Sequence, residues 1–166
     1  MSKSTDDLKA AFAGESQANR RYLAFAKKAE EQGLPQIAKL FRAIAQAETV
    51  HALNHLRALG EVKSVPENLQ TAINGEHYEI NIMYPAFIAD AEAEGDKKAL
   101  ASFRDAWEVE KGHEQLYTKA LANIGKDVPV VDYYVCPVCG YAHEGPMTAE
   151  RCPVCNTLSS RFEKIA

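Results

Sequence analysis

The sequence lacks long basic runs and long apolar stretches. Its 166 residues include 19 lysines and arginines against 23 aspartates and glutamates, a formal charge of −4, and no basic run exceeds two residues. This balance argues against a broad cationic face for nucleic acid. No apolar run approaches the ~18 residues of a membrane span, and the polar, acidic start is unlike a signal peptide. We therefore expect a cytoplasmic protein that binds neither nucleic acid nor membranes.

Cysteine is absent from the first 135 residues, and all four cysteines lie between Cys136 and Cys155. Alanine has the opposite distribution, because 23 of 26 alanines precede Gly125 whereas four of seven prolines follow it. From this change in composition we predict a main domain at 1–126, a linker at 127–132 and a small module at 133–166. Since nothing suggests export, a thiolate metal site is a better interpretation of the cysteines than disulfides.

The apolar periodicity of the first part predicts four long helices. They span about 5–32, 35–60, 65–95 and 96–124. Glycine follows or ends each of them, as is typical of helix C-termini. Ser4 with Asp7 is the expected start of the first helix, and Ser64 with Glu67 forms a capping-box pattern before the third. Pro85 lies inside the third helix, where it should bend the helix or free a carbonyl.

The two halves of this helical region repeat each other. At a shift of 62 residues, Tyr22, Glu48 and His51 recur as Tyr84, Glu110 and His113. Glu15 recurs as Glu76 at a shift of only 61. Each half is therefore a helix pair, and two pairs make a four-helix bundle. The change of shift implies one inserted residue between Glu76 and Tyr84. We expect a π-bulge there that turns Glu79 inward.

Each predicted helix carries a glutamate near the middle of its apolar face. These residues are Glu15, Glu48, Glu76 and Glu110. An unpaired buried carboxylate is costly, and the sequence has no matching inward lysines or arginines. Residues three apart share a helix face, so His51 and His113 can join Glu48 and Glu110. This is the ligand pattern of a di-metal carboxylate site, and its mixed oxygen and imidazole donors favour iron or manganese.

Other side chains near these ligands have two interpretations each. Glu79 has no counterpart in the first half and lies at the edge of the apolar stripe, so it is a seventh ligand or a solvated carboxylate. His55 could compete with His51, although the repeat favours His51. Tyr22 and Tyr84 are core aromatics or hydrogen-bond partners of the ligand carboxylates.

Two Cys-Pro-Val-Cys knuckles, separated by twelve residues, occupy the C-terminal module. Their thiolates, from Cys136, Cys139, Cys152 and Cys155, predict one closed tetrahedral metal site. His143 is interpreted as a surface residue, because four thiolates already fill the coordination sphere. The ligands alone leave iron and zinc both open, since a zinc ribbon uses the same set. The module is too short for a core of its own, so the metal should also hold it together.

Taken together, these motifs resemble the rubrerythrin family. The segments that carry the resemblance are GESQANRRY (14–22), ETVH (48–51), GEHYEINIMYP (75–85), EVEKGH (108–113) and the CPVCGY…CPVC tail, which resembles the family's rubredoxin-like domain. The resemblance implies a mainly α fold, with a ferritin-like four-helix bundle followed by a rubredoxin-like metal-knuckle β module. It also implies a non-haem di-iron peroxidase that reduces hydrogen peroxide to water and protects against oxidative stress. The electrons would come from an NAD(P)H-linked reductase or a rubredoxin through the thiolate iron.

The resemblance further implies a role for each candidate ligand. Glu48 and Glu110 would bridge two irons. Glu15 would bind the first iron, and Glu76 and His113 would bind the second. Glu79 and His51 would be alternative ligands of the first iron that exchange with its oxidation state. The four cysteines would hold a mononuclear iron, with zinc as the alternative. The residues expected to act in catalysis are Glu79, His51, Tyr22 and Tyr84.

Two other functions fit part of the sequence. A ferritin-like iron-oxidising or iron-storage protein would use the same carboxylates with a structural zinc ribbon, but Glu79 and the rubredoxin-like tail argue against it. A pure electron carrier would not need an open carboxylate site.

The distance along the fourth helix also bears on assembly. Glu110 lies 14 residues before Ile124, or roughly 21 Å at 1.5 Å per residue. We therefore expect each tail to lie far from its own bundle centre, and a head-to-tail homodimer in which electrons pass between subunits.

Overall fold

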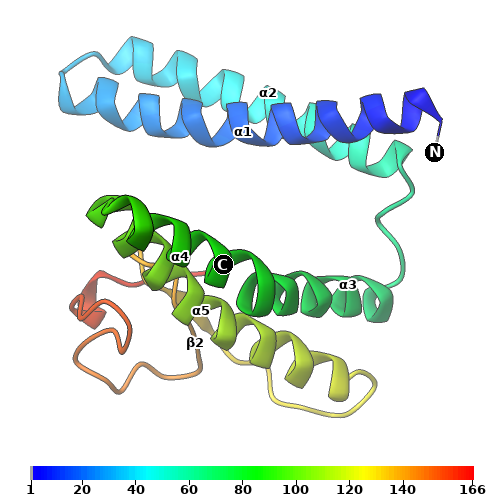
Figure 1. Ribbon diagram of the computed structural model, residues 1–166, viewed down its shortest axis with the longest axis vertical. Helices are drawn as coiled ribbons and strands as arrows, with labels where there is room; N and C mark the ends of the chain where they lie inside the picture. The colour runs from blue at the N-terminus through cyan, green and yellow to red at the C-terminus, as the bar shows by residue number, and fades with distance from the viewer. Residues whose placement is uncertain (1) are drawn as a thin grey trace. The chain divides into compact units, whose positions relative to one another are not determined.

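The structure is a computed structural model that describes residues 2–166, and it divides into two compact units, one up to Lys63 and one from Ser64 onward. The first unit is an antiparallel hairpin of α1 (Lys3–Glu31) and α2 (Pro35–Ala58), shown in Figure 1. Its two helices approach closely because the buried positions between them are alanines. These are Ala26, Ala29, Ala38, Ala45 and Ala52.

Polar contacts fix the start and the middle of this hairpin. The hydroxyl of Ser2 accepts the N–H of Thr5 at 3.3 Å, so the first helix begins two residues earlier than the predicted Ser4 cap. In the middle, the amide of Asn19 donates to the Ala45 carbonyl at 2.7 Å and to the Thr49 hydroxyl at 2.8 Å. These two bonds fix the register of α1 against α2.

The second unit contains the other helical stretches, α3 (Val65–Tyr78), the π-helical segment η1 (Glu79–Met83), α4 (Tyr84–Glu94) and α5 (Lys97–Ala122). The predicted capping box of Ser64 and Glu67 is present at the start of α3. Asp96 accepts the N–H groups of Lys98 and Ala99, both at 3.0 Å, and so caps α5.

The predicted bulge in the third helical stretch is confirmed. The N–H of Tyr84 donates to the carbonyl of Glu79, five residues back, and η1 occupies the interval in which the repeat shift changes. One extra residue is thus absorbed as a wider turn, and the helix continues as α4 without a break.

The C-terminal module is a small three-stranded antiparallel sheet, in the order β2-β1-β3, with a short 3₁₀ turn, η2 (Ser159–Arg161). Its strands are β1 (Tyr133–Val135), β2 (Ala142–Glu144) and β3 (Glu163–Lys164). On the central strand, Tyr134 pairs with His143 on one side and with Lys164 on the other. Its largest buried side chain is Cys136, so the metal-binding thiolates form the centre of the module.

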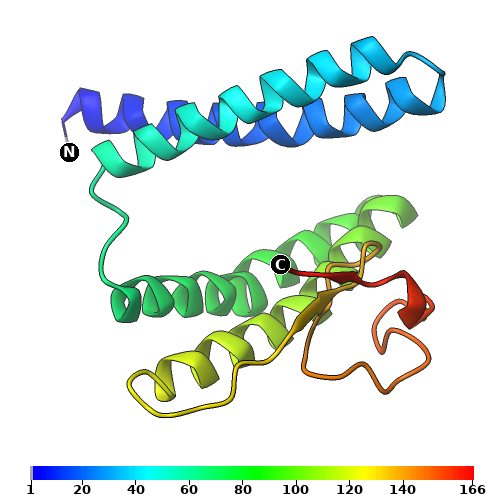
Figure 2. The same cartoon turned by 180° about the vertical axis from the view of Figure 1, so that it is seen from behind.

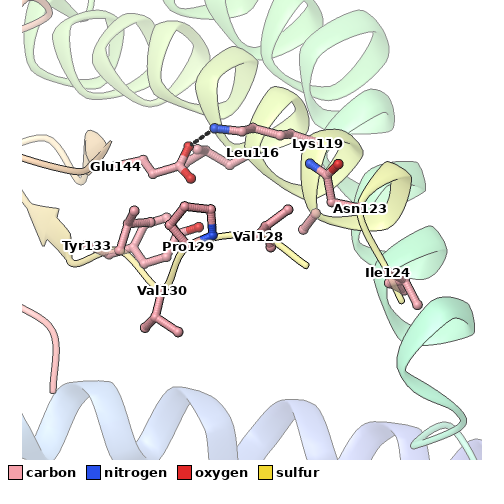
Figure 3. Close-up of a pocket in the computed structure, with 11 residues that line it drawn as sticks. Leu116, Lys119, Asn123, Ile124, Val128, Pro129, Val130, Tyr133 and Glu144 are labelled. Atoms are coloured by element: carbon pink, nitrogen blue, oxygen red, sulfur yellow. Dashed lines mark hydrogen bonds and ion pairs between the residues drawn. The ribbon is translucent and has the colours of Figure 1, made fainter. Parts of the chain in front are cut away.

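The C-terminal module packs against the side of α5. The expectation that the module lies far from Glu110 of the same chain is therefore wrong. After α5 the chain turns back along that helix, as Figure 2 shows. Lys119 of α5 forms an ion pair with Glu144 of β2, and Gly140 lies against the buried Val109. A cavity of about 520 Å³ separates the linker from the end of α5 (Figure 3). The linker is therefore not closely packed on α5, and the docking of the module on α5 depends on contacts of the module itself.

The four predicted helical stretches and the small knuckle module are thus all present. Among residues 2–166, no helix is both long enough and apolar enough to span a membrane.

Two glycines with opposite backbone roles test how these helices are built. Gly95 ends α4 with φ +71°, whereas Gly75 lies inside α3 with open space around its α-carbon. Gly95→Ala should lower the free energy of unfolding by about 1 kcal/mol, because a side chain strains a left-handed residue. Gly75→Ala should raise it by up to about 1 kcal/mol through helix propensity. Urea unfolding of the metal-free protein measures both, and equal effects would contradict these assignments.

Candidate metal centres

The first unit brings together Glu15 of α1 with Glu48 and His51 of α2. Each offers one ligand atom, and these atoms lie within 4.8 Å of one another. Nδ1 of His51 lies 2.9 Å from a carboxylate oxygen of Glu48 and 4.0 Å from one of Glu15. The Glu48 side chain is only 15% exposed. The i,i+3 spacing on α2 and the register between the helices therefore create a compact set of metal donors.

The second unit contains the equivalent cluster, with Glu76 from α3 and Glu110 and His113 from α5. Nδ1 of His113 lies 2.6 Å from Glu110, whose side chain is 16% exposed. Burial, and then the nearby Glu110 carboxylate, raise the pKa of Glu76 to about 7. Without a cation this cluster therefore retains a proton near neutral pH, and a metal ion that displaced the proton would relieve the repulsion.

Glu79 and Tyr84 lie at the edge of this second cluster. Burial, followed by the charge of Glu110, raises the pKa of Glu79, and the charge of Glu79 in turn contributes to the raised pKa of Glu76. The pKa of Tyr84 is raised by burial and then by the charges of these carboxylates, so its phenol keeps its proton. Glu79 is thus an electrostatic neighbour of the cluster, outside the group whose ligand atoms lie within 4.8 Å.

The two tyrosines expected to act in catalysis have similar aromatic surroundings. Tyr22 packs against Phe25 and Phe41, and Tyr84 packs against Phe87 and Phe103, with ring centroids 6.2–6.4 Å apart. His55 lies on α2, one turn after His51. Among residues 2–166 it does not belong to any of the groups of metal donors.

The four cysteines converge on one point in the C-terminal module. Their sulfur atoms lie within 4.8 Å of one another, with two pairs at 3.6 Å. The two knuckles are built alike, because the N–H of Gly140 donates to the Cys136 carbonyl and that of Asn156 to the Cys152 carbonyl, both at 3.0 Å. Both donor residues have positive φ, 87° and 63°.

The pKa values of the Cys139 and Cys155 thiols differ because their burial and hydrogen bonds differ. Burial raises the pKa of Cys139. Burial also acts on Cys155, but hydrogen bonds with the hydroxyl and backbone of Thr157 and with the thiols of Cys139 and Cys136 together outweigh it and lower the pKa of Cys155 to about 6. His143 lies outside this group and donates to the Pro146 carbonyl at 3.1 Å. A set of four converging thiols, one of them with a lowered pKa, suits iron or zinc.

The structure also reveals a link between the two centres of the second unit that the sequence did not predict. Nε2 of His113 donates to the carbonyl of Gly140 at 3.3 Å, and Gly140 directly follows Cys139. With the Nε2 proton held by a carbonyl, the lone pair on Nδ1 faces the carboxylates and is available to a metal. No local signal encodes this contact, because it depends on how the module docks on α5.

Oxygen and imidazole donors, beside a separate tetrathiolate site, define a non-haem metalloprotein with two kinds of metal centre. A family model described as "Rubrerythrin" matches residues 6–121, and one described as "Rubrerythrin, rubredoxin-like domain" matches residues 134–163. The chain belongs to the rubrerythrin family. This membership and the donor sets confirm the predicted ferritin-like and rubredoxin-like fold and the predicted di-iron and tetrathiolate metal sites.

Individual relatives match over almost the whole chain. Rubrerythrin-2 of Clostridium acetobutylicum is 37% identical over 95% of this chain and 94% of its own length. Nigerythrin of Nitratidesulfovibrio vulgaris is 41% identical over 90% of this chain and 80% of its own length. A solved structure of nigerythrin in its fully reduced, all-ferrous state gives a TM-score of 0.60 at 37% identity, over 99% of this chain and 88% of that one. The family assigns the protein a peroxidase-like oxidoreductase role in oxidative stress.

The raised pKa of Glu76 predicts a specific pH dependence for the metal-free protein. A carboxyl whose pKa rises from 4.5 to about 7 on folding binds more protons in the folded state between these values. The free energy of unfolding should therefore fall as pH rises through this window. Glu76→Gln should flatten the decline and make the metal-free protein more stable than wild type above pH 7.

Urea unfolding across this pH range provides the measurement. The control is Glu61→Gln at an exposed position, which should leave the pH profile unchanged. Parallel profiles for Glu76→Gln and wild type would contradict the assigned pKa shift.

Proposed function

We propose that the protein is a peroxidase that reduces hydrogen peroxide to water with electrons from an NAD(P)H-linked reductase or a rubredoxin. The observation that carries this proposal is the docking of the thiolate module on the helix that bears Glu110 and His113. A storage protein with a structural zinc ribbon has no use for a direct link between its ribbon and a ligand histidine. The docking therefore favours the peroxidase over the iron-storage alternative.

The proposed ligands follow the predicted assignment. Seven side chains would hold the two irons, namely Glu15, Glu48, His51, Glu76, Glu79, Glu110 and His113, and the four cysteines would hold the third. Glu79 and His51 would be alternative ligands of one iron that exchange with its oxidation state. We also retain the predicted division into a di-iron domain at 1–126, a linker at 127–132 and an electron-transfer module at 133–166.

Ferrous ions, when bound, supply the two electrons that cleave the O–O bond. The protein positions a group that can hydrogen-bond to the reactant, since the protonated phenol of Tyr84 lies beside the carboxylates of the second unit. Reduction of one peroxide to two waters consumes two electrons and two protons. Groups such as Glu79, whose pKa burial raises, are suited to hold such protons close to the site.

The proposed electron route stays within one chain. It runs from the Cys139 thiolate through the adjoining peptide to the Gly140 carbonyl, and across a 3.3 Å hydrogen bond to the His113 imidazole. This replaces the expectation of transfer between subunits, whose distance argument does not hold. Val138, which lies between the cysteines of the first knuckle and is 54% exposed, offers an apolar surface at which a donor protein can approach.

Two substitutions should separate iron binding from turnover. Glu110→Ala should lower the iron content, because it removes a bridging ligand and leaves Glu76 without its shared cation. Glu79→Ala should retain the iron but slow oxidation of the reduced protein by peroxide about 10- to 100-fold. Metal analysis and stopped-flow absorbance measure the two effects. A Glu79→Ala protein that reacts at the wild-type rate would rule out a role for Glu79.

Mixed assemblies should distinguish the two electron routes. One chain carries Cys136→Ser and Cys139→Ser, and the other carries Glu110→Ala with an intact tail. Transfer within a chain predicts almost no NADH-linked peroxidase activity, because the intact tail contacts only its own defective α5. Mixtures of each variant with wild type are the controls. Recovery of about half the wild-type activity would show transfer between chains and refute the route through His113 of the same chain.

A further inference from the structure

The π-helical segment leaves one carbonyl without a main-chain donor. The N–H of Tyr84 is already bonded to Glu79, five residues back. In the same register the carbonyl of Ile80 would require the N–H of residue 85, but that residue is Pro85 and has none. The carbonyl instead accepts the indole Nε1–H of Trp107 on α5, at 2.8 Å. An unbonded, partly buried carbonyl would be costly, so this bond stabilises the segment.

Comparison of the two helix pairs shows that this bond accompanies the insertion. In the first pair, Asn19 on α1 donates to the Ala45 carbonyl on α2 at 2.7 Å. The residues 62 positions further on are Asn81 and Trp107. Asn81 donates to the His77 carbonyl within its own helix at 2.8 Å, and the cross-helix bond runs in the opposite direction, from Trp107.

The indole is itself held in place on α5. The Lys111 ammonium lies 3.5 Å from the centroid of the Trp107 ring, which is a favourable cation–π geometry. Lys111 is in turn paired with Glu108 at 2.6 Å. Trp107 also precedes Glu110 by three residues, so the two side chains share one face of α5. That face carries both the donor to Ile80 and the carboxylate whose charge contributes most, after burial, to raising the pKa of Glu79.

From these contacts we infer that Trp107 is a positioning residue for Glu79. Its indole N–H holds the carbonyl of the residue that follows Glu79, keeps the extra residue within segment 79–83, and so fixes the approach of the Glu79 carboxylate to Glu110 and His113. This inference rests on the proposed role of Glu79 in the peroxidase reaction.

Hydrogen exchange of the iron-loaded protein tests the bond independently of activity. Trp107→Phe keeps an aromatic ring but removes the donor, so the amides of residues 80–84 should exchange about five- to tenfold faster. The matched control is Asn19→Ala, which removes the cross-helix bond of the first unit and should leave these amides unchanged. Unchanged exchange in Trp107→Phe would overturn the inference.

A rescue variant guards against a general loss of folding. Pro85→Ala restores an N–H in the register that Ile80 requires, so it should return the exchange rates of Trp107→Phe to near wild type. If Trp107→Phe does not fold, recovery of folding in the double variant with Pro85→Ala shows that the missing donor was the cause. Failure of Pro85→Ala to restore protection would show that Trp107 acts through ring packing, which contradicts the inference.

Kinetics then connect the bond to Glu79. Trp107→Phe should slow the oxidation of the reduced protein by peroxide. Addition of Pro85→Ala to Trp107→Phe should restore the rate. In a Glu79→Ala background, Trp107→Phe should have no further effect. Equal slowing in both backgrounds would refute action through Glu79. If Glu79→Ala alone reacts at the wild-type rate, the proposed function of Glu79 fails, whereas the exchange experiment still decides whether Trp107 holds the segment.

Discussion

A carboxylate that leaves water for the interface between two helices must give up its charge or meet a cation. In the metal-free second unit Glu76 does the former, since its pKa rises to about 7 beside Glu110. In the first unit, Glu15, Glu48 and His51 bring three donor atoms within 4.8 Å of one another. A metal ion bound by the second cluster would supply the cation that Glu76 and Glu110 lack. The alanine-lined helix contacts and the i,i+3 histidines are the features that permit metal binding.

The two helix pairs share this ligand pattern but differ in what surrounds it. The second pair alone contains the inserted residue, and the resulting π-helical turn brings Glu79 and Tyr84 to the edge of its carboxylates. The second pair also carries the thiolate module on α5, where His113 meets Gly140. Among residues 2–166, the second helix pair thus differs from the first in its bulged turn and in the thiolate module docked on α5.

Much of this arrangement could be predicted because it follows from local periodicity. Glutamates on apolar stripes, the i,i+3 histidines and the change of repeat shift are enough to predict the two clusters and the π-helical turn. The spacing of the knuckles does the same for the four cysteines.

Features that depend on tertiary packing could not be predicted in this way. The docking of the module on α5 involves Lys119 with Glu144 and Gly140 against Val109, and neither pair has a sequence signal. A length argument therefore placed the module too far from His113. The bond from Trp107 to Ile80 was also missed, although the effect of Pro85 on a carbonyl was expected, because the donor lies 27 residues away on another helix.

The proposed peroxidase requires the thiolate module and the carboxylate site to act together within one chain. The most direct test is an anaerobic titration of the fully reduced, iron-loaded protein with hydrogen peroxide, followed by absorbance and iron analysis. The account predicts one peroxide consumed for every two electrons stored, reoxidation of the thiolate iron after the carboxylate-bound irons, and all iron retained in the protein. A thiolate site that stays colourless and unreactive while added ferrous ion accumulates as ferric mineral would contradict it.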